Sequence, residues 1–328
     1  MYGIKHPIRK LMKKSIRPYL PVLVLLLLLS HPKLSFRGAQ AGLLLWFNVV
    51  LPTLLPFMLC SSLLISWGGA ELLSRPLLPF FSFLGLSPAG GYCLLTGLLC
   101  GYPMGPKTTA DLLSRRQITD AEANELLAVS ACPSPMFVAG YLQPRLPQEI
   151  PFLFVVTALY LPVLLTGIYF HRKKLCSQEQ RRQLSPKPKT GREEASFDQI
   201  LMNSLELMVK IGGFLMLYSI LAVFLMAIPD HLLPSGFKAV LLSLPEMTTG
   251  IDFISKTVSG LPEAVLILFS AAFGGLSGVS QTRTVIKNAG LSIRHYLRWK
   301  LIHASLSSII LILLSSLQQL LVTLPPAP

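Results

Sequence analysis

Two glycine-rich segments contain the residues best suited to bind a solute. The first is Gly101–Lys107 (GYPMGPK), and the second is Gly274–Gly278 (GGLSG), which is followed by the polar residues Ser280–Thr282. Glycine allows a ligand or another backbone to approach closely. A helix that ends at such a turn leaves backbone groups unpaired and carries a fractional charge. If the two turns face each other, they form a site for a small polar solute, anionic or heteroaromatic.

The candidate substrate-binding residues lie in and beside these segments. Lys107 is predicted either to bind a carboxylate or to extend to the membrane interface, and Tyr102 either to stack on an aromatic solute or to anchor at that interface. Glu246 is predicted either to couple proton movement or to cap the turn before Thr248. The serine and glutamine side chains either donate to a solute or join membrane helices. The full set is Gly101, Tyr102, Gly105, Lys107, Ser134, Glu246, Gly274, Gly275, Ser277 and Gln281.

Known catalytic and metal-binding patterns are missing from the sequence. The six histidines form no HExxH motif, and neither GxSxG nor a phosphate-binding GxxxxGK[ST] occurs. The five cysteines show no CxxC spacing and no accompanying histidine cluster. We therefore expect a protein that is not an enzyme, with no catalytic residues, no metal and no cofactor.

The composition indicates a membrane protein. Of the 328 residues, 52% are hydrophobic and only 13% are charged, and the mean hydropathy is +0.59. A soluble domain carries roughly a quarter charged residues, so lipid must cover much of this surface. The 29 basic residues outnumber the 15 acidic ones, but 14 of the basic residues lie in residues 1–17 and 171–198, beside apolar runs. This is the pattern of cytoplasmic segments of a multi-pass inner-membrane protein, and it argues against nucleic acid as a partner.

The apolar segments that must position the site differ in length. Phe152–Phe170, Ile200–Ile228 and Ser305–Val322 are long enough to cross a bilayer, whereas Gly90–Gly101 and Ala264–Phe273 are half that length. The segment Ala41–Trp67 contains Pro52 and Pro56, which predict a kink or a break. Tyr19–Ser30 is expected to be an uncleaved first helix or signal anchor.

The two halves of the chain match at an offset of 173 residues, at which Gly101–Gly105 corresponds to Gly274–Gly278 and Thr109 to Thr282. Interrupted segments that recur in both halves are typical of transporter binding sites. We predict an all-α polytopic protein with two inverted repeats whose broken or re-entrant helices meet near the membrane midplane. The predicted divisions are a basic N-terminus with the first hydrophobic segment (1–37), a first repeat (38–170), a basic cytoplasmic linker (171–198), a second repeat (199–322) and a tail (323–328).

These motifs resemble the YlbJ-type sporulation integral membrane proteins of the nucleoside-recognition (Gate) domain family. The resemblance covers roughly residues 38–320 and keeps the order of its motifs. It implies two Gate repeats, a role in late sporulation and, in that group, movement of dipicolinic acid across a forespore membrane. The segments that carry it are Gly101–Lys107, Ala110–Leu112, Ser134–Phe137, Asn48–Phe57, Ile211–Phe214, Glu246–Gly250 and Phe273–Ser277.

Residues and resemblance together predict transport of a small polar or anionic solute during sporulation, with dipicolinic acid as a candidate. One alternative is a non-transporting membrane scaffold or assembly factor for the spore cortex or coat. Another is a nucleoside-type solute transporter. The expected partners are a small-molecule solute, the lipid bilayer and either a second copy of the chain or other sporulation membrane proteins. The expected location is the cell membrane or a membrane around the forespore.

Overall fold

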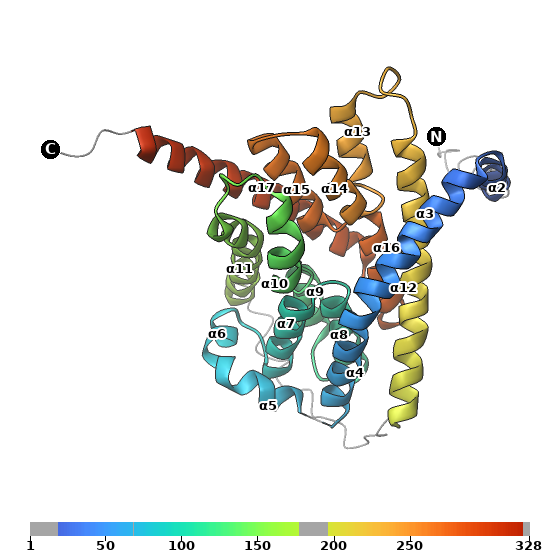
Figure 1. The fold of residues 1–328 in the computed structure, drawn as a ribbon. Helices are drawn as coiled ribbons and strands as arrows, with labels where there is room; N and C mark the ends of the chain where they lie inside the picture. Colours follow the sequence, from blue (N-terminus) through green and yellow to red (C-terminus); the bar gives the residue numbers. More distant parts are fainter. Residues whose placement is uncertain (1–18, 68, 177–195, 324–328) are drawn as a thin grey trace, which may run out of the picture.

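The computed structural model describes residues 19–67, 69–176 and 196–323, and the secondary structure within these ranges is helical (Figure 1). Four helical stretches are long and apolar enough to cross a membrane, and two further bent pairs raise the number to six if each pair is one span. The all-α polytopic prediction is therefore confirmed. The four stretches are Phe152–Lys173, Phe197–Met226, Leu261–Ala289 and Ile293–Leu321, and the bent pairs are Pro21–Ser30 with Pro32–Val50 and Leu54–Trp67 with Leu72–Phe83.

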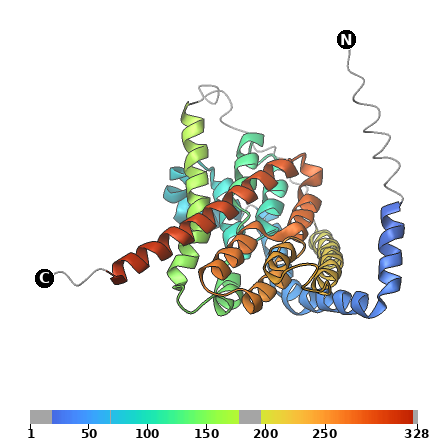
Figure 2. The ribbon, with the colours of Figure 1, turned by 90° about the horizontal axis from the view of Figure 1, so that it is seen from above.

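The first half of the chain is built mainly from short helices. Helix α2 stands apart at one edge of the bundle in both views (Figures 1 and 2) and meets α3 at a bend of 105°. The bounds in this half are α2 Tyr19–Ser30, α3 Pro32–Leu45, η1 Trp46–Val50, α4 Leu51–Trp67, α5 Ala70–Ser74, α6 Leu78–Phe83, α7 Pro88–Cys100, α8 Met104–Ser114, α9 Asp120–Val129, α10 Pro135–Phe137 and α11 Phe152–Cys176.

The second half contains the two longest helices. Helix α17 runs obliquely past the others, and its C-terminal part extends beyond them (Figures 1 and 2). The bounds are α12 Phe197–Met226, α13 Ser235–Leu242, α14 Met247–Thr257, α15 Leu261–Phe273, α16 Gly275–Ile286 and α17 Ile293–Thr323.

The prolines of α4 do not break the helix where the sequence suggested. Helix α4 continues through Pro56, and the irregular part lies upstream, in the π-helical turn η1. Pro52 has no N–H, so the carbonyl of Asn48 loses its usual donor four residues later. In the π-helical turn, the Leu51 N–H donates instead to the carbonyl of Trp46, five residues earlier.

Helices α3 and α12, one from each half, pack side by side (Figure 1). A Cβ atom placed on Gly42 would lie 2.6 Å from the Cα of Met216, and the Trp46 indole donates to the Met208 carbonyl at 2.8 Å. Glycine therefore allows the two backbones to approach more closely than any side chain would permit.

Gly42→Ala is expected to lower the melting temperature of the purified protein in detergent, since the new methyl group must push α12 away at a cost of about 1–3 kcal/mol. Gly213→Ala is the matched control, because a Cβ there meets nothing within 4 Å and alanine favours a helix by up to about 1 kcal/mol. Equal melting temperatures for the two variants would contradict this close packing.

Element bounds in the two halves correspond. Helices α7 and α15 have 13 residues each, and α15 begins and ends 173 residues after α7. Helix α17 begins 173 residues after α9. This correspondence supports the two-repeat interpretation, which stays a prediction. The halves differ after their glycines, because α16 follows Gly274 directly within one long apolar stretch, whereas α8 begins three residues after Gly101.

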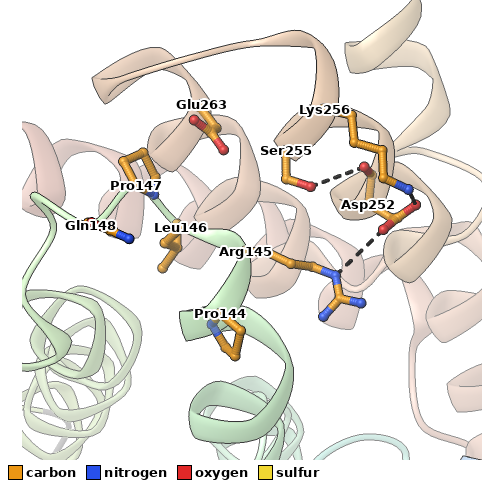
Figure 3. Close-up of a pocket in the computed structure, with 9 residues that line it drawn as sticks. All are labelled: Pro144, Arg145, Leu146, Pro147, Gln148, Asp252, Ser255, Lys256 and Glu263. Carbon is orange, nitrogen blue, oxygen red and sulfur yellow. Dashed lines mark hydrogen bonds and ion pairs between the residues drawn. The ribbon is translucent and has the colours of Figure 1, made fainter.

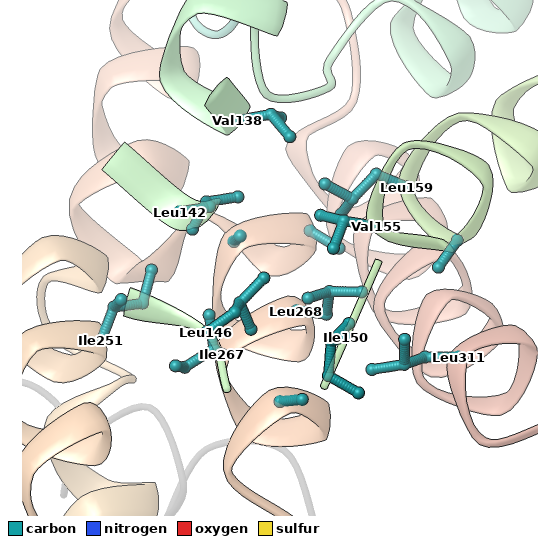
Figure 4. Packing of buried hydrophobic residues seen from close by; sticks show 14 of the residues in the cluster. Val138, Leu142, Leu146, Ile150, Val155, Leu159, Ile251, Ile267, Leu268 and Leu311 are labelled. Atoms are coloured by element: carbon teal, nitrogen blue, oxygen red, sulfur yellow. The ribbon is translucent and has the colours of Figure 1, made fainter. Parts of the chain in front are cut away.

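The largest buried cluster joins residues of both halves (Figure 4). Val138, Leu142 and Leu146 come from the segment before α11, and they pack with residues of α14, α15 and α17 such as Ile251 and Leu268. The irregular segment between α10 and α11 thus lies against the second half, so a shared apolar core holds the halves together.

Candidate functional site

The two glycine turns lie against each other. Gly101 and Gly274 end α7 and α15 with φ of 78° and 83°, in the region that favours glycine. A Cβ on Gly274 would lie 3.2 Å from Cζ of Tyr102, and the Tyr102 hydroxyl donates to the Ala271 carbonyl at 3.2 Å. The same hydroxyl contacts the sulfur of Met247. Tyr102 of the first half therefore fills the space beside the second-half break, so the broken helices meet as predicted.

A buried lysine, Lys300, lies beside the contact between the two glycine turns. Lys300 of α17 is 1% exposed, its Nζ donates to the Ala131 carbonyl at 2.9 Å, and it lies 4.8 Å from the centre of the Tyr102 ring. The ion pairs found in the described part of the chain include none at Lys300. Lys238, which is also buried, has Asp230 at 2.6 Å. A buried cation without a carboxylate is costly and marks a candidate functional site in a membrane protein.

Lys300 belongs to a buried polar face of α17. Tyr296, Lys300, His303 and Ser307 follow one another at helical spacing, and each is less than 5% exposed. His303 Nε2 lies 2.9 Å from the hydroxyl of Thr166 on α11. Sequence reasoning missed this face, because Lys300 follows the basic residues Arg294 and Arg298 closely in the sequence, where a cluster of cations is typical of a solvated helix end. The spacing of the polar residues through an apolar segment is the signal that indicates it.

Lys107 forms an ion pair with a carboxylate on its own helix. Its Nζ lies 2.6 Å from Asp111 and donates to Ser62 of α4 at 3.1 Å. Asp111 is four residues later in the same helix, so this pair was visible in the sequence. Because the charge of Lys107 is already compensated, Lys300 is the better candidate for binding an anion here.

Two other predicted residues cap helices. Glu246 is 2% exposed and precedes α14, where its carboxylate accepts from the Thr249 N–H at 2.8 Å and from the Thr248 hydroxyl. This agrees with the capping alternative for Glu246. Ser134 likewise accepts from the Phe137 N–H at 3.3 Å at the start of α10.

The backbone groups at the start of α16 are occupied by protein. The N–H of Leu276 donates to the Leu244 carbonyl at 2.6 Å, and the N–H of Ser277 donates to the Pro245 carbonyl at 3.0 Å. A Cβ on Gly275 would lie 3.3 Å from the Leu244 oxygen. The predicted unpaired backbone groups are therefore satisfied at these two positions, by the segment between α13 and α14.

The remaining predicted residues make contacts within their own halves. A Cβ on Gly105 would lie 2.1 Å from the Ser130 carbonyl oxygen, so Gly105 lets α8 pack against the end of α9. Gln281 donates to Ser277 at 3.1 Å, one turn earlier. The hydroxyl groups of Ser280 and of Tyr218 on α12 form a hydrogen bond of 2.7 Å. The polar residues named after the two glycine turns thus form hydrogen bonds within their own halves. Tyr102 makes the contact between the two turns.

An open pocket of about 560 Å³ lies at another place, between residues 144–148, which precede α11, and helices α14 and α15 (Figure 3). Arg145 stacks on the Tyr141 ring at 3.8 Å and lies 3.8 Å from Asp252, which also pairs with Lys256. The pocket does not include any of the predicted site residues. Its lining residues are Pro144, Arg145, Leu146, Pro147, Gln148, Asp252, Ser255, Lys256 and Glu263.

Comparison with known proteins identified one relative of clear similarity. The chain is 28% identical over 321 residues to the sporulation integral membrane protein YlbJ of Bacillus subtilis (strain 168), covering 87% of this chain and 79% of the relative. This similarity confirms the YlbJ-type resemblance. No family model matches the chain, and no solved structure matches it. The relative is named for sporulation and for its place in a membrane, and the apolar helices of this chain agree with a membrane protein.

Proposed function

We propose that this protein moves a small anionic solute, with dipicolinic acid as the leading candidate, across a membrane of the sporulating cell. The observation that carries the proposal is Lys300, a buried amine without an acidic partner among the described residues, placed where both halves meet. Dipicolinic acid is an aromatic dicarboxylate, so a lysine beside a tyrosine ring offers a charge for a carboxylate and a face for the ring.

Lys300 is enclosed by elements of both halves. Tyr102 comes from the first half, Lys300 from the second, and the Ala131 carbonyl from the break between α9 and α10. A solute that reaches Lys300 must separate Tyr102 from Gly274 or from Lys300. Opening along this contact, alternately toward each side, is the kind of motion by which repeats give access to a site between them.

The sporulation setting is proposed from the relative, which is named as a sporulation integral membrane protein. A membrane around the forespore is the matching location. The two alternatives stated above, a scaffold and a nucleoside-type transporter, do not predict a dipicolinate content that depends on Lys300 in the following experiment.

The test uses a Bacillus subtilis strain that lacks its own YlbJ and expresses this chain. Dipicolinate is measured in purified spores from strains carrying wild type, Lys300→Met or Lys210→Met at equal membrane abundance. Lys210 is an exposed lysine paired with Glu206, so its change is the control. Wild type and Lys210→Met are expected to raise the dipicolinate content, and Lys300→Met is not. Equal content in all strains, including the one without the chain, contradicts transport of dipicolinate and favours one of the two alternatives.

A further inference from the structure

The buried polar face of α17 continues past Lys300 to Ser315. His303, Ser307 and Ser315 lie on the same side of the helix, and each is at most 7% exposed. At 1.5 Å per residue, Lys300 and Ser315 are about 22 Å apart along the helix axis, and the apolar core of a bilayer is roughly 30 Å thick. The polar face therefore extends from the Lys300 site toward one surface of the membrane.

Contacts between α11 and α17 show which surface this is. The rings of Trp299 and Phe170 have centres 5.1 Å apart, and one turn later on α17 His303 contacts Thr166, one turn earlier on α11. The two helices therefore run in opposite directions, and α11 leads into the predicted cytoplasmic linker. The polar face of α17 thus leads from Lys300 to the surface opposite the linker.

The hydroxyl groups of Ser307 and Ser315 have no hydrogen-bond partner among the described residues. Ser308 on the same helix instead donates to the Ala304 carbonyl at 3.0 Å, as serines in helices commonly do. Close packing of α17 against α11 and α15 does not require the hydroxyls, because Ala304 packs on the same face without one. A buried hydroxyl without a partner is costly, so it indicates a position where a polar ligand or water binds.

One apolar side chain interrupts this face. Leu311 lies between Ser307 and Ser315 on the same side of α17 and is fully buried. It belongs to the apolar cluster that contains Leu159 of α11 and Leu268 of α15 (Figure 4). An ionised solute does not cross such a dry constriction, because burying an unpaired charge is costly. Movement of α17 away from α11 or α15 at Leu311 would join the two hydroxyls into one polar path.

We infer that the solute travels between Lys300 and the membrane surface opposite the linker along this face of α17, with Ser307 and Ser315 as successive hydrogen-bond donors and Leu311 as the barrier. Each hydroxyl can donate to a carboxylate oxygen, and neither adds a charge that would retain the anion. Conduction requires sites that bind strongly enough for entry and weakly enough for release. This inference rests on the proposed function, to which it adds the route of the solute.

The test measures whether a water-soluble anion reaches this face. Single serine-to-cysteine variants of the full chain in lipid nanodiscs are treated with sulfonatoethyl methanethiosulfonate, an anionic thiol reagent that does not enter lipid. Helix α17 contains no native cysteine, so mass spectrometry of its peptides counts only the introduced thiol. Ser305→Cys is the matched control, because Ser305 lies two residues before Ser307 but is exposed on the outside of the bundle.

Ser307→Cys and Ser315→Cys are expected to react at least about tenfold faster than Ser305→Cys, because a thiol that faces lipid does not ionise to the reactive thiolate. Adding Leu311→Ala is expected to raise the reaction rate of Ser307→Cys and to leave that of Ser315→Cys, which lies outside the barrier, unchanged. Equal rates for Ser307→Cys and Ser305→Cys overturn the route. A rate at Ser307→Cys that Leu311→Ala does not change overturns the barrier.

Uptake of dipicolinate by proteoliposomes separates this inference from the proposed function. Modified Ser307→Cys is expected to lose uptake, because the added sulfonate repels an anion in the route, whereas treated Ser305→Cys keeps it. Uptake by wild type together with an unreactive Ser307→Cys, or uptake that persists after Ser307→Cys is modified, overturns the route and leaves the proposed function standing. Absence of uptake by wild type overturns the proposed solute, and the reactivity of Ser307→Cys still decides whether an anion reaches this face.

Discussion

Lys300→Met is expected to lower the affinity for dipicolinate by at least about 100-fold and to abolish its uptake into vesicles. Methionine keeps the length and the apolar part of the side chain, but it removes the amine that lies 4.8 Å from the centre of the Tyr102 ring, where the two halves meet. Removing one partner of a buried charge pair costs about 2–5 kcal/mol, and a hundredfold change in affinity corresponds to about 2.8 kcal/mol.

The measurement is uptake of labelled dipicolinate by proteoliposomes that contain equal amounts of each purified variant. Lys210→Met serves as the control, because Lys210 is half-exposed and paired with Glu206 on the same helix. Uptake by Lys300→Met at the rate of wild type would contradict the assignment of Lys300 to the solute site. Loss of uptake in Lys210→Met as well would indicate that lysine changes act through the fold.

Gly274→Ala is expected to destabilise the protein by about 2–5 kcal/mol and to impair uptake. Two costs add up at this position. A residue with a side chain is strained at the φ of 83°, by about 1–2 kcal/mol. In addition, the new Cβ would lie 3.2 Å from Cζ of Tyr102, and overpacking of this kind costs about 1–3 kcal/mol.

Gly290→Ala separates these two costs. Gly290 has a φ of 72°, but a Cβ there meets nothing within 4 Å, so only the backbone strain applies. Thermal unfolding in detergent is expected to show a small loss of stability for Gly290→Ala and a larger one for Gly274→Ala. In a double-mutant cycle, Gly274→Ala is expected to cost less stability in a Tyr102→Ala background than in wild type, because the new Cβ no longer meets the Tyr102 ring. Equal losses for the two single variants would contradict the contact between Tyr102 and Gly274.

The sequence allowed prediction of the features that depend on local chemistry. Apolar length predicted the membrane helices, and glycine predicted where α7 and α15 end, because few residues other than glycine adopt the positive φ found at Gly101 and Gly274. Spacing between the halves predicted that Gly101 and Gly274 occupy equivalent places. It also predicted that the broken helices meet. They meet at Tyr102, which fills the space beside Gly274.

Features that depend on tertiary contacts were not predicted. Lys300 gains its position from a contact with Ala131, which is 169 residues earlier in the chain. The N–H groups of Leu276 and Ser277 are occupied by Leu244 and Pro245, which no local pattern reveals. The ion pair of Lys107 with Asp111 differs from these tertiary contacts, because a spacing of four residues on one helix is a local pattern that predicts such a pair.

The most direct test of a solute site between the two halves is a cryo-EM map of the full chain in lipid nanodiscs with dipicolinate. We predict density for the solute between Lys300 Nζ and the Tyr102 ring, with Tyr102 moved away from Gly274. Density for dipicolinate in the pocket between Arg145 and Asp252, with Tyr102 and Lys300 still in contact, would contradict this account.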